Sequence, residues 1–430
     1  MLLLAGLVAC SSGDAPTERP NLLLFISDDH GWPDYGFAGH EFVETPNVDR
    51  LASEGIVFPN GYASASICKP SLRTLLTGIP PQVWERARDE LAVSRGGLAP
   101  GRESQYFDIT LPRMLATAGY ESFAGGKMFE GSRPDAGFAS CRGGRQGPCG
   151  PPRFGRDSME VLFDWLESQR GPWFAWVAPK LPHRPYDPPE DLLRLYADLP
   201  LGDEAKRYYA NVTRMDLRLG EILDFLSERG IAEETVVIYL ADNGWEQRRT
   251  GTTPHENKLG EPTGKASIHD RGFRTPVIVR WPGRVPGGTR SDALILFEDV
   301  YTTLLALAGV RPPACSQGRD FGAITRGEDA SWSRSEVFNQ VDWMRPPDHG
   351  SGGPRREEGW FLRSGRWAYS HWVARQREEL FDLSSDPLGR EEIGDAFPAK
   401  RAELRERAAA LARQLATRRC RLSAGRVAAT

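Results

Sequence analysis

Two unbroken apolar runs, each followed by acidic or amide side chains, constrain the fold more than any other feature of this sequence. The first run, in "NLLLFISDDHG", ends at Asp28 and Asp29. The second run, in "ETVVIYLADNGWEQ", ends at Asp242 and Asn243. Strands without polar alternation are typical of sheets covered on both faces, as in parallel α/β folds. The two runs therefore predict interior strands of one such sheet.

Helical and strand patterns alternate through the first three-quarters of the chain. A helix is predicted where apolar residues recur every three or four positions from Val212 to Leu226, with its end at Gly230. The stretches "PWFAWVAPK" and "TPVIVRW" indicate two more interior strands. This alternation predicts an α/β domain over residues 21–330, with a mostly parallel sheet flanked by helices.

The pattern changes after about residue 330. The stretches "EGWFLRSGRWAYSHW" and "EELFDLSSDP" are typical of antiparallel strands separated by turns. A terminal helix is predicted from one apolar stripe, formed by Leu404, Ala408, Leu411 and Leu415. We therefore expect a smaller α+β subdomain over residues 331–430, in which the segment from Met344 to Arg356 is a surface loop.

The N-terminal stretch "MLLLAGLVACSSGDAPTERP" contains an apolar run that is too short to span a bilayer. Such a run is typical of a secretory signal peptide. "LVAC" resembles a bacterial lipobox, which implies that Cys10 is lipidated and that residues 1–20 are a signal peptide and tether. The alternative is an ordinary secretory signal that is cleaved nearby. We expect an exported bacterial lipoprotein of the cell envelope, in the periplasm or at the outer membrane.

Export makes disulfides possible. The six cysteines can therefore be sorted into those that could form disulfides and those with other roles. Cys10 is assigned to the lipid and Cys68 stands apart. The cysteines left for pairing, whose connectivity the sequence leaves open, are Cys141, Cys149, Cys315 and Cys420. Neither a CxxC pair nor a Cys/His zinc spacing occurs, which argues against a thiolate metal site. The net charge of −4 gives no reason to expect nucleic acid as a partner.

Ligands bind beyond the carboxyl ends of the strands in open α/β sheets. Asp28, Asp29, Asp242 and Asn243 all follow such strand ends. Carboxylates gathered without a cation would repel one another, so a divalent ion is the simplest resolution. Oxygen ligands favour Ca²⁺ or Mg²⁺ over zinc or copper. The alternative is that each pair merely caps a helix.

Six motifs in a fixed order resemble one known family. They are "NLLLFISDDHG", "TPNVDRLASEG", "CKPSLRTLLTG", "LPRMLATAGYESFAGGK", "YYANVTRMDLRLGEILDFLSERGIAEETVVIYLADNG" and "GKASIHDRGFRTPVIVRWPG". From Asn21 to Gly283 the chain resembles the type I, formylglycine-dependent sulfatases of the alkaline-phosphatase-like superfamily. "EELFDLSSDP" resembles the C-terminal subdomain of that family. The resemblance implies an alkaline-phosphatase-like fold and a sulfuric ester hydrolase.

The resemblance also implies roles for particular residues. In that family the cysteine of the C-x-P-S-R motif is oxidised to formylglycine, whose hydrate attacks the sulfate, and Cys68 occupies this position. One Ca²⁺, with Mg²⁺ as the alternative, would be held by Asp28, Asp29, residue 68, Asp242 and Asn243. Lys127 and Lys265 match two lysines that hold the sulfate. His183 matches a histidine that contacts sulfate and protonates the departing alcohol.

Three positions depart from the family pattern. Leu72 stands in place of the motif arginine, and Arg73 follows it; one step along a helix turns a side chain by about 100°, so Arg73 is no automatic substitute. Phe129 replaces a histidine that commonly takes the proton of the diol. Asp270 and Arg271 replace a Glu-Gly pair outside the chemistry. Four other histidines are candidates only for lining the pocket, namely His30, His40, His255 and His269.

These observations lead to the hypothesis of a lipid-anchored envelope sulfatase that acts on a sulfated carbohydrate. Its other expected partners are the formylglycine-generating enzyme during maturation and the membrane, through Cys10. The loop from Gly131 to Phe154 is a candidate for recognition of an anionic sugar, and the alternative is a disordered surface loop. One alternative is a phosphate or phosphonate monoester hydrolase of the same superfamily. Another is a catalytically lapsed protein that binds sulfated glycans, which the departures at Leu72 and Phe129 motivate.

Overall fold

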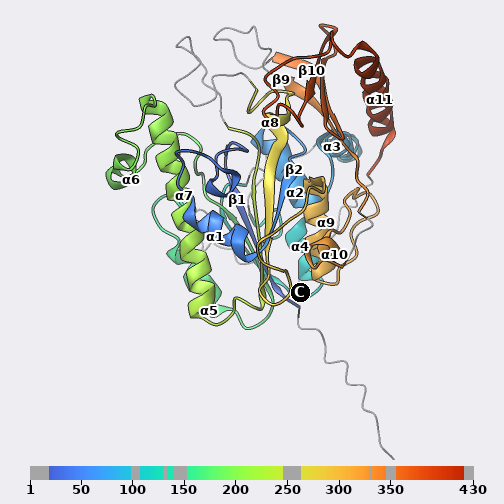
Figure 1. Ribbon diagram of the computed structural model, residues 1–430. Coiled ribbons are helices and arrows are strands. Elements are labelled where there is room, and N and C mark those ends of the chain that lie inside the picture. The colour runs from blue at the N-terminus through green and yellow to red at the C-terminus, as the bar shows by residue number, and fades with distance from the viewer. Residues whose placement is uncertain are drawn as a thin grey trace, which may run out of the picture.

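A central sheet with helices on both faces forms the larger part of the molecule (Figure 1). The computed structural model describes residues 19–97, 107–128, 133–138, 153–245, 263–328, 332–344 and 355–420. Its strands are β1 (Asn21–Ser27), β2 (Ile56–Tyr62), β3 (Glu121–Gly126), β4 (Trp173–Ala178), β5 (Thr235–Ala241), β6 (Arg274–Arg280), β7 (Thr289–Arg290) and β8 (Ile295–Leu296). Within the described residues they form an eight-stranded sheet in the order β3-β4-β1-β5-β6-β2-β7, with β8 paired to β2.

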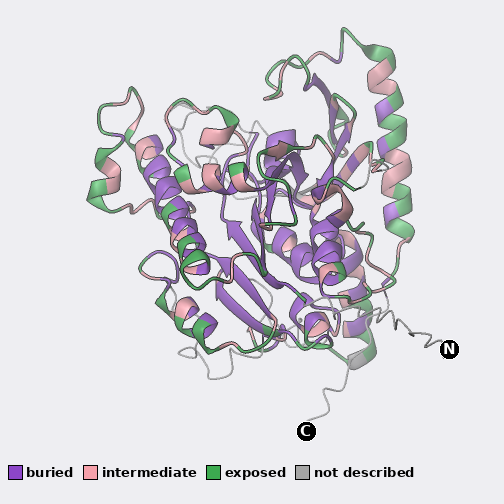
Figure 2. Cartoon of the chain, turned by 60° about the horizontal axis from the view of Figure 1, so that its bottom comes forward, coloured by how far each residue is buried: buried purple, intermediate pink, exposed green. Residues whose placement is uncertain are grey.

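The sheet is mostly parallel, as the sequence predicts. Strand β1 pairs in parallel with both β4 and β5, and β3 pairs in parallel with β4. Strand β6 runs in the opposite direction between β5 and β2. The two apolar runs are β1 and β5, whose residues are all buried because helices cover both faces (Figure 2).

Helices pack on the two faces of this sheet in separate groups. Helices α1 and α7 contact each other on one face, and α2, α4 and α9 contact one another on the other (Figure 1). The helices are α1 (Pro46–Glu54), α2 (Cys68–Thr77), α3 (Pro81–Arg95), α4 (Leu111–Ala116), α5 (Glu160–Ser168), α6 (Glu190–Arg194), α7 (Asp203–Glu228), α8 (Asp270–Phe273), α9 (Phe297–Leu307), α10 (Gly322–Thr325) and α11 (Pro398–Thr417), with a short 3₁₀ helix η1 at Gly36–Ala38. The helix predicted to end at Gly230 is α7, which begins earlier than its apolar pattern indicated.

A second, antiparallel sheet forms the C-terminal part, as predicted. It consists of β9 (Glu336–Met344), β10 (Arg355–Ser364), β11 (Trp367–Trp372) and β12 (Arg377–Asp382). Helix α11 covers it, with Leu404 and Ala408 packed into one buried cluster with the strands. The predicted surface loop is wrong at its ends, because Met344 pairs with Arg355 in the β9–β10 ladder. Its middle lies outside the described residues.

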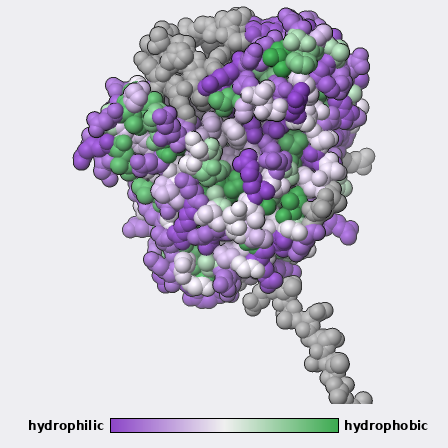
Figure 3. Space-filling model, viewed as in Figure 1, coloured by the Kyte–Doolittle hydropathy of each residue, from purple (hydrophilic) through white to green (hydrophobic). Residues whose placement is uncertain are grey.

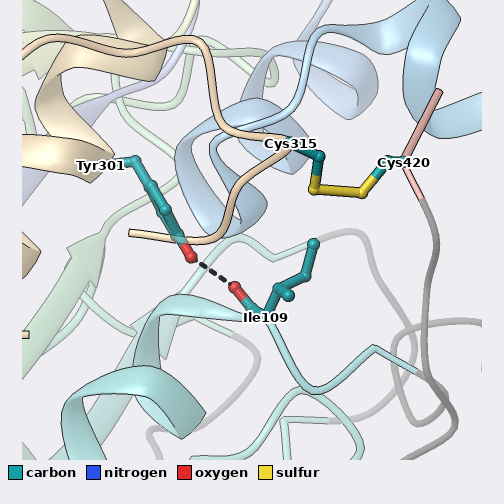
Figure 4. Close-up of a disulfide and its surroundings, with 4 residues drawn as sticks. All are labelled: Ile109, Tyr301, Cys315 and Cys420. Carbon is teal, nitrogen blue, oxygen red and sulfur yellow. Dashed lines mark hydrogen bonds between the residues drawn. A yellow bond between two sulfur atoms is a disulfide. The ribbon is translucent and has the colours of Figure 1, made fainter. Parts of the chain in front are cut away.

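A disulfide joins Cys315, in the segment between α9 and α10, to Cys420, just beyond α11 (Figure 4). The other two cysteines considered for pairing, Cys141 and Cys149, lie outside the described residues, as does Cys10. Among the described helices, none has the length and apolar character needed to cross a membrane. Hydrophilic side chains predominate on the face that Figure 3 shows, with apolar ones scattered among them.

Candidate active site

The polar residues that follow β1 and β5 meet at one edge of the sheet. Ser27 lies opposite Ala241 in the parallel register, so the residues after them emerge side by side. The backbone N–H of Asp29 donates to Oδ1 of Asp242 at 3.0 Å, and Nδ2 of Asn243 donates to Oδ1 of Asp29 at 2.7 Å. The predicted convergence of these side chains is present.

Asp29 adopts a backbone conformation that side chains rarely take, with φ of 59°. Such a conformation costs on the order of 1 kcal/mol or more and persists only where surrounding contacts enforce it. Here the hydrogen bonds with Asp242 and Asn243 hold it. Strain of this kind is often concentrated at functional sites.

Cys68 lies at the centre of this group, at the first residue of α2. Its Sγ is 3.4 Å from Oδ1 of Asp29 and 3.8 Å from Oδ1 of Asp28. The potential ligand atoms of Asp28, Asp29, Cys68 and Asp242 all lie within 4.8 Å of one another, and all four residues are buried. Ser71 fixes the start of α2 here, because its hydroxyl donates to the carbonyl of Asp242 at 2.5 Å.

Two lysines neutralise part of the acidic charge. Nζ of Lys127 pairs with Asp28 and lies 3.5 Å from Oδ2 of Asp242. Nζ of Lys265 lies 2.6 Å from Oδ2 of Asp29. Three carboxylates therefore face two ammonium groups in a buried setting, which leaves an excess of negative charge.

Lys127 is placed by the close approach of two strands. It directly follows β3, and its N–H donates to the carbonyl of Ala178, at the end of β4, at 2.7 Å. Gly126, the residue before it, has φ of 86°, and a Cβ there would lie 1.9 Å from the Ala178 oxygen. Only glycine fits this position without displacing Lys127.

His183 reaches the same group from the loop after β4. Its Nε2 lies 3.5 Å from Oδ2 of Asp29, and its Nδ1 lies 2.6 Å from the carbonyl oxygen of Arg184. A carbonyl oxygen only accepts, so Nδ1 carries a hydrogen and donates it. Burial lowers the pKa of His183, although the Asp29 carboxylate opposes this shift.

Burial and the nearby charges shift the pKa values of the three carboxyl groups in different directions. Burial raises the pKa of Asp28 to about 6 and that of Asp242 to about 7, and the ammonium of Lys127 offsets only part of this effect. Burial also acts to raise the pKa of Asp29, but the positive charges of Lys265, Lys127 and His183 together outweigh burial and hold that pKa below its usual value. Asp28 and Asp242 therefore need further positive charge to stay ionised.

The donor set fits a hard divalent cation. Oδ2 of Asp28 and Oδ1 of Asn243 are buried and accept no hydrogen bond within the described part of the chain. Leaving such an acceptor unmatched costs about 1–3 kcal/mol each. A cation would meet both oxygens and balance the carboxylates, and oxygen ligands of this kind suit calcium or magnesium. Asp28, Asp29, Asp242, Asn243 and residue 68 could hold it.

The departures from the motif have clear structural consequences. Leu72 packs in the main apolar core. Arg73 lies with its guanidinium carbon 3.3 Å from the ring centroid of Trp84 in α3, so its side chain turns toward that helix. Asp270 accepts a hydrogen bond from the hydroxyl of Tyr62 at 2.7 Å. Phe129 lies outside the described residues.

The histidines expected to line the pocket have other surroundings. His30 is fully buried, with Nδ1 3.1 Å from the Tyr239 hydroxyl and Nε2 2.8 Å from the Asp34 carbonyl. It supports the turn behind Asp28 and Asp29, so the expectation is wrong for His30. The side chain of His40 is almost wholly buried, beside Asp34. His269 lies 2.8 Å from Glu379 of β12, and His255 is outside the described residues, as is most of the loop from Gly131 to Phe154.

The sequence interpretation did not single out Arg156, which precedes α5 and is buried. It donates to backbone carbonyls of the His183 loop, and the motifs carried no signal for it.

Comparison with known proteins identifies the family. The model of the Sulfatase family matches residues 20–310, and that of the N-sulphoglucosamine sulphohydrolase C-terminal region matches residues 263–418. The chain belongs to the sulfatase family. It is thereby assigned to the sulfuric ester hydrolases and to the alkaline-phosphatase-like fold, as the motifs implied.

Individual relatives agree with this assignment. The chain is 30% identical over 367 residues to N-acetylgalactosamine-6-sulfatase of Canis lupus familiaris, covering 73% of this chain and 67% of the relative. It is 29% identical over 385 residues to human arylsulfatase A, covering 77% and 73%. The match to the human N-acetylgalactosamine-6-sulfatase covers 63% of that protein, so this chain spans about two thirds of the length of such relatives.

Solved structures show the same fold at lower identity. The structure of Ps i-CgsB in complex with k-i-k-neocarrahexaose superposes with a TM-score of 0.73 at 18% identity, covering 94% of each chain. The phosphonate monoester hydrolase of Agrobacterium radiobacter superposes with a TM-score of 0.66 at 19% identity, covering 92% of this chain and 96% of that one. At this identity the two structures show that the fold is shared, and they assign no activity to this chain.

Proposed function

We propose that this chain hydrolyses the sulfate esters of a glycan, using a formylglycine made from Cys68 and one bound divalent cation. The observation that carries the proposal is the buried group of Asp28, Asp29, Cys68 and Asp242, with ligand atoms within 4.8 Å of one another. Family membership supports sulfate as the anion. The excess of acidic charge supports the cation.

Calcium is the proposed ion, with magnesium as the alternative. Its ligands would be Asp28, Asp29, residue 68, Asp242 and Asn243. The ion would supply Lewis acidity and balance the charge of the sulfate oxygens. The unmatched oxygens of Asp28 and Asn243 support calcium, because it takes about six to eight oxygen ligands in flexible geometry.

Modification of Cys68 is proposed because the unmodified thiol would be a poor nucleophile here. Burial and the adjacent carboxylates raise the pKa of Cys68 well above its usual value. The thiol therefore stays protonated near neutral pH, and only a thiolate attacks efficiently. Hydrated formylglycine would supply one hydroxyl that attacks sulfur and a second whose deprotonation expels sulfate and restores the aldehyde. A separate formylglycine-generating enzyme would carry out the oxidation during maturation.

Three basic side chains would handle the anion and the leaving group. Lys127 and Lys265 already face the carboxylates, and their compact ammonium groups would hold sulfate and stabilise charge that builds up on its oxygens. His183 directs Nε2 toward the site because its Nδ1 donates to the Arg184 carbonyl. A protonated Nε2 would donate to the oxygen of the departing alcohol.

A sulfated carbohydrate is the proposed substrate class. Relatives carry the names N-acetylgalactosamine-6-sulfatase and ulvan-active sulfatase. One structure of the same fold was solved with its substrate D-glucosamine-2-N,6-O-disulfate. These names support a sugar sulfate for this chain.

We also propose that the chain is exported and anchored through Cys10. The disulfide between Cys315 and Cys420 supports export, because disulfides persist in oxidising compartments. Fractionation of the native host should find the protein in the envelope, released by detergent and not by salt. A Cys10→Ser variant should lose the membrane association.

A phosphate or phosphonate monoester hydrolase is the second candidate. Two observations favour it, namely the fold neighbour of that name and Leu72 in place of the arginine that accompanies the modified cysteine in the motif. A catalytically lapsed glycan-binding protein is the third candidate, on the grounds of Leu72 and Phe129. It predicts calcium and glycan binding without turnover.

Mass spectrometry of the tryptic peptide that contains Cys68, from protein made in its native host, tests the nucleophile. We expect an aldehyde in place of the thiol, and turnover of 4-nitrophenyl sulfate and N-acetylgalactosamine 6-sulfate. An intact thiol with faster turnover of 4-nitrophenyl phosphate would favour the second candidate. Binding of the sugar without release of sulfate would favour the third.

The nearly isosteric Asp242→Asn variant tests the cation site. We expect a loss of turnover of about 100-fold or more and the loss of calcium-dependent thermal stabilisation. Asp224→Asn is the matched control, because Asp224 is exposed and pairs with Arg50 on the surface. Unchanged activity of Asp242→Asn would refute the assignment of the site.

A further inference from the structure

The loop that carries His183 has no regular secondary structure. It runs from the end of β4 to the start of α6, over residues 179–189. On one side, the N–H of Asp28 donates to the Leu181 carbonyl at 2.8 Å, which fixes the loop to the end of β1. The position of the imidazole depends on what holds the other side.

Arg156 binds four groups on that other side, and Asn211 adds one hydrogen bond to the Pro185 carbonyl at 3.3 Å. Its Nη2 donates to the carbonyls of Lys180 and His183, and its Nη1 donates to the carbonyl of Pro185 at 3.1 Å and to the carboxylate of Asp187. The guanidinium thus spans the loop on both sides of the histidine. Arg156 is only 4% exposed, so these hydrogen bonds are shielded from water.

Arg156 is itself held in place. Arg214 of α7 donates a hydrogen bond from Nη2 to the carbonyl of Arg156. It donates a second from Nη1 to the carbonyl of Asp187, at 3.1 Å. The buried arginine is therefore fixed from its backbone as well as from its side chain. Lysine could not reproduce the arrangement, because one ammonium cannot span several acceptors that a planar guanidinium fork reaches.

We propose that Arg156 is a positioning residue for His183 in the transfer of a proton to the leaving group. The carbonyl of His183 is one of its acceptors, so Arg156 fixes the backbone from which the imidazole projects. The imidazole in turn directs Nε2 toward Asp29, with 3.5 Å between Nε2 and Oδ2. Misplacement of a proton donor by about 1 Å can cost on the order of 100-fold in rate.

The inference rests on the proposed function, and a series of leaving groups tests it. 4-Nitrophenolate departs without a proton, whereas an unsubstituted phenolate needs one, so only the second substrate depends on a placed acid. For Arg156→Lys we expect kcat with phenyl sulfate to fall about 10- to 100-fold. With 4-nitrophenyl sulfate kcat should fall less than about 3-fold, and KM should change little for both substrates.

Arg153→Lys is the matched control. Arg153 is also an arginine that pairs with Asp187, at 3.2 Å, but its side chain is half exposed and its hydrogen bonds within the described residues go to carboxylates. We expect its kcat to match that of the native enzyme with both substrates. Equal losses of kcat with the two substrates in Arg156→Lys would overturn the proposal.

A double-mutant cycle with His183→Ala separates positioning from general support of the structure. If Arg156 acts through His183, then Arg156→Lys should cost no further activity once the imidazole is removed. The same fold loss in the His183→Ala background would assign Arg156 a purely structural role. If Arg156→Lys does not fold, Asp187→Asn removes the carboxylate partner of the guanidinium and should show the same substrate-selective loss, at under about 10-fold.

A readout without turnover keeps the inference separate from the proposed function. The chain has seven histidines, so the ring signal of His183 can be assigned by its disappearance in His183→Ala. We expect this signal to shift in Arg156→Lys and to stay in place in Arg153→Lys. A protein that hydrolyses no sulfate ester but shows this shift would refute the function and keep the positioning role. An unmoved signal would overturn the positioning role.

Discussion

Removal of the disulfide between Cys315 and Cys420 tests how the C-terminal helix is held to the sulfatase domain. The bond, drawn in Figure 4, joins residues 105 positions apart. Cys315 precedes the antiparallel sheet in the sequence, and Cys420 follows α11. Closing a loop of this length lowers the entropy of the unfolded chain by an amount worth about 5 kcal/mol at 25 °C. The double variant Cys315→Ala, Cys420→Ala should lose stability of this order.

The expected change in melting temperature follows from the size of the chain. Unfolding entropy is about 2.1 cal/mol/K per residue, or about 0.9 kcal/mol/K for 430 residues. A loss of about 5 kcal/mol therefore lowers Tm by about 5 °C. Alanine is preferred to serine because Cys420 is buried beside Trp84 and Leu415, where an unmatched hydroxyl would add its own cost.

Differential scanning calorimetry of the native and double-variant proteins measures this shift. The two proteins should bind calcium with the same affinity, because neither cysteine belongs to the buried group of Asp28, Asp29, Cys68 and Asp242. A double variant that melts within about 1 °C of the native protein would refute the reasoning, since it would mean that α11 is held fully by packing. A large loss of calcium affinity would refute the independence of the two regions.

Three further predictions follow from particular positions. Calcium at about 100 times its Kd should raise Tm by about 3 °C, as 2.7 kcal/mol of linkage requires, and chelation should remove both this shift and the activity. Gly126→Ala should abolish turnover and lower Tm, because the new Cβ would meet the Ala178 carbonyl. Gly119→Ala is the control, because Gly119 has a similar φ of 82° but open space around it. Equal losses of activity in the two variants would contradict this account. Burial raises the pKa of Asp216 to about 6, above its unfolded value of 3.8, so the folded chain holds this proton more tightly than the unfolded chain does. The free energy of unfolding should therefore fall by about 3 kcal/mol as the pH rises from about 4 to 6. Asp216→Asn should flatten that slope in thermal melts, and an unchanged slope would assign it to another group.

The parallel core and its acidic edge were predictable because they depend on local pattern and simple sheet geometry. The runs before Asp28 and Asp242 are apolar on both faces, and parallel strands place their carboxyl ends on one edge. Pro70, two residues after Cys68, is typical of the first turn of a helix, and Cys68 begins α2. Its presence among the carboxylates came only from the resemblance, because no local signal relates α2 to β1.

Other features depend on contacts between distant segments and could not be predicted. The direction of β6 is one, since "TPVIVRW" reads the same in a parallel or an antiparallel strand. The surroundings of His30 are another, because a histidine next to two candidate cation ligands looks like a pocket residue until the Tyr239 and Asp34 partners are known. Arg156 is a third, as its acceptors are backbone carbonyls, which leave no mark in the sequence.

The reversed direction of β6 explains how Lys265 reaches the site. Asp28, Lys127 and Asp242 all follow parallel strands, and residues that precede such strands would lie at the opposite edge of the sheet. Lys265 precedes β6, which is antiparallel to β5, so the start of β6 lies at the edge where β5 ends. The N–H of Lys265 donates to the carbonyl of Trp245, just beyond Asn243, at 2.8 Å, which secures this approach.

The same geometry places the C-terminal subdomain beside the site. The segment between Lys265 and β6 is held from the second sheet, because the hydroxyl of Ser370 in β11 donates to the Ile268 carbonyl at 2.7 Å and Glu379 in β12 lies 2.8 Å from His269. Lys265 is therefore supported from both sheets, whereas the N–H of Lys127 is held by Ala178 at the end of β4 in the central sheet. Loosening the second sheet, as by Ser370→Ala, should thus weaken the contribution of Lys265 and leave that of Lys127 intact. Cation affinity and kcat measured together would separate these two effects.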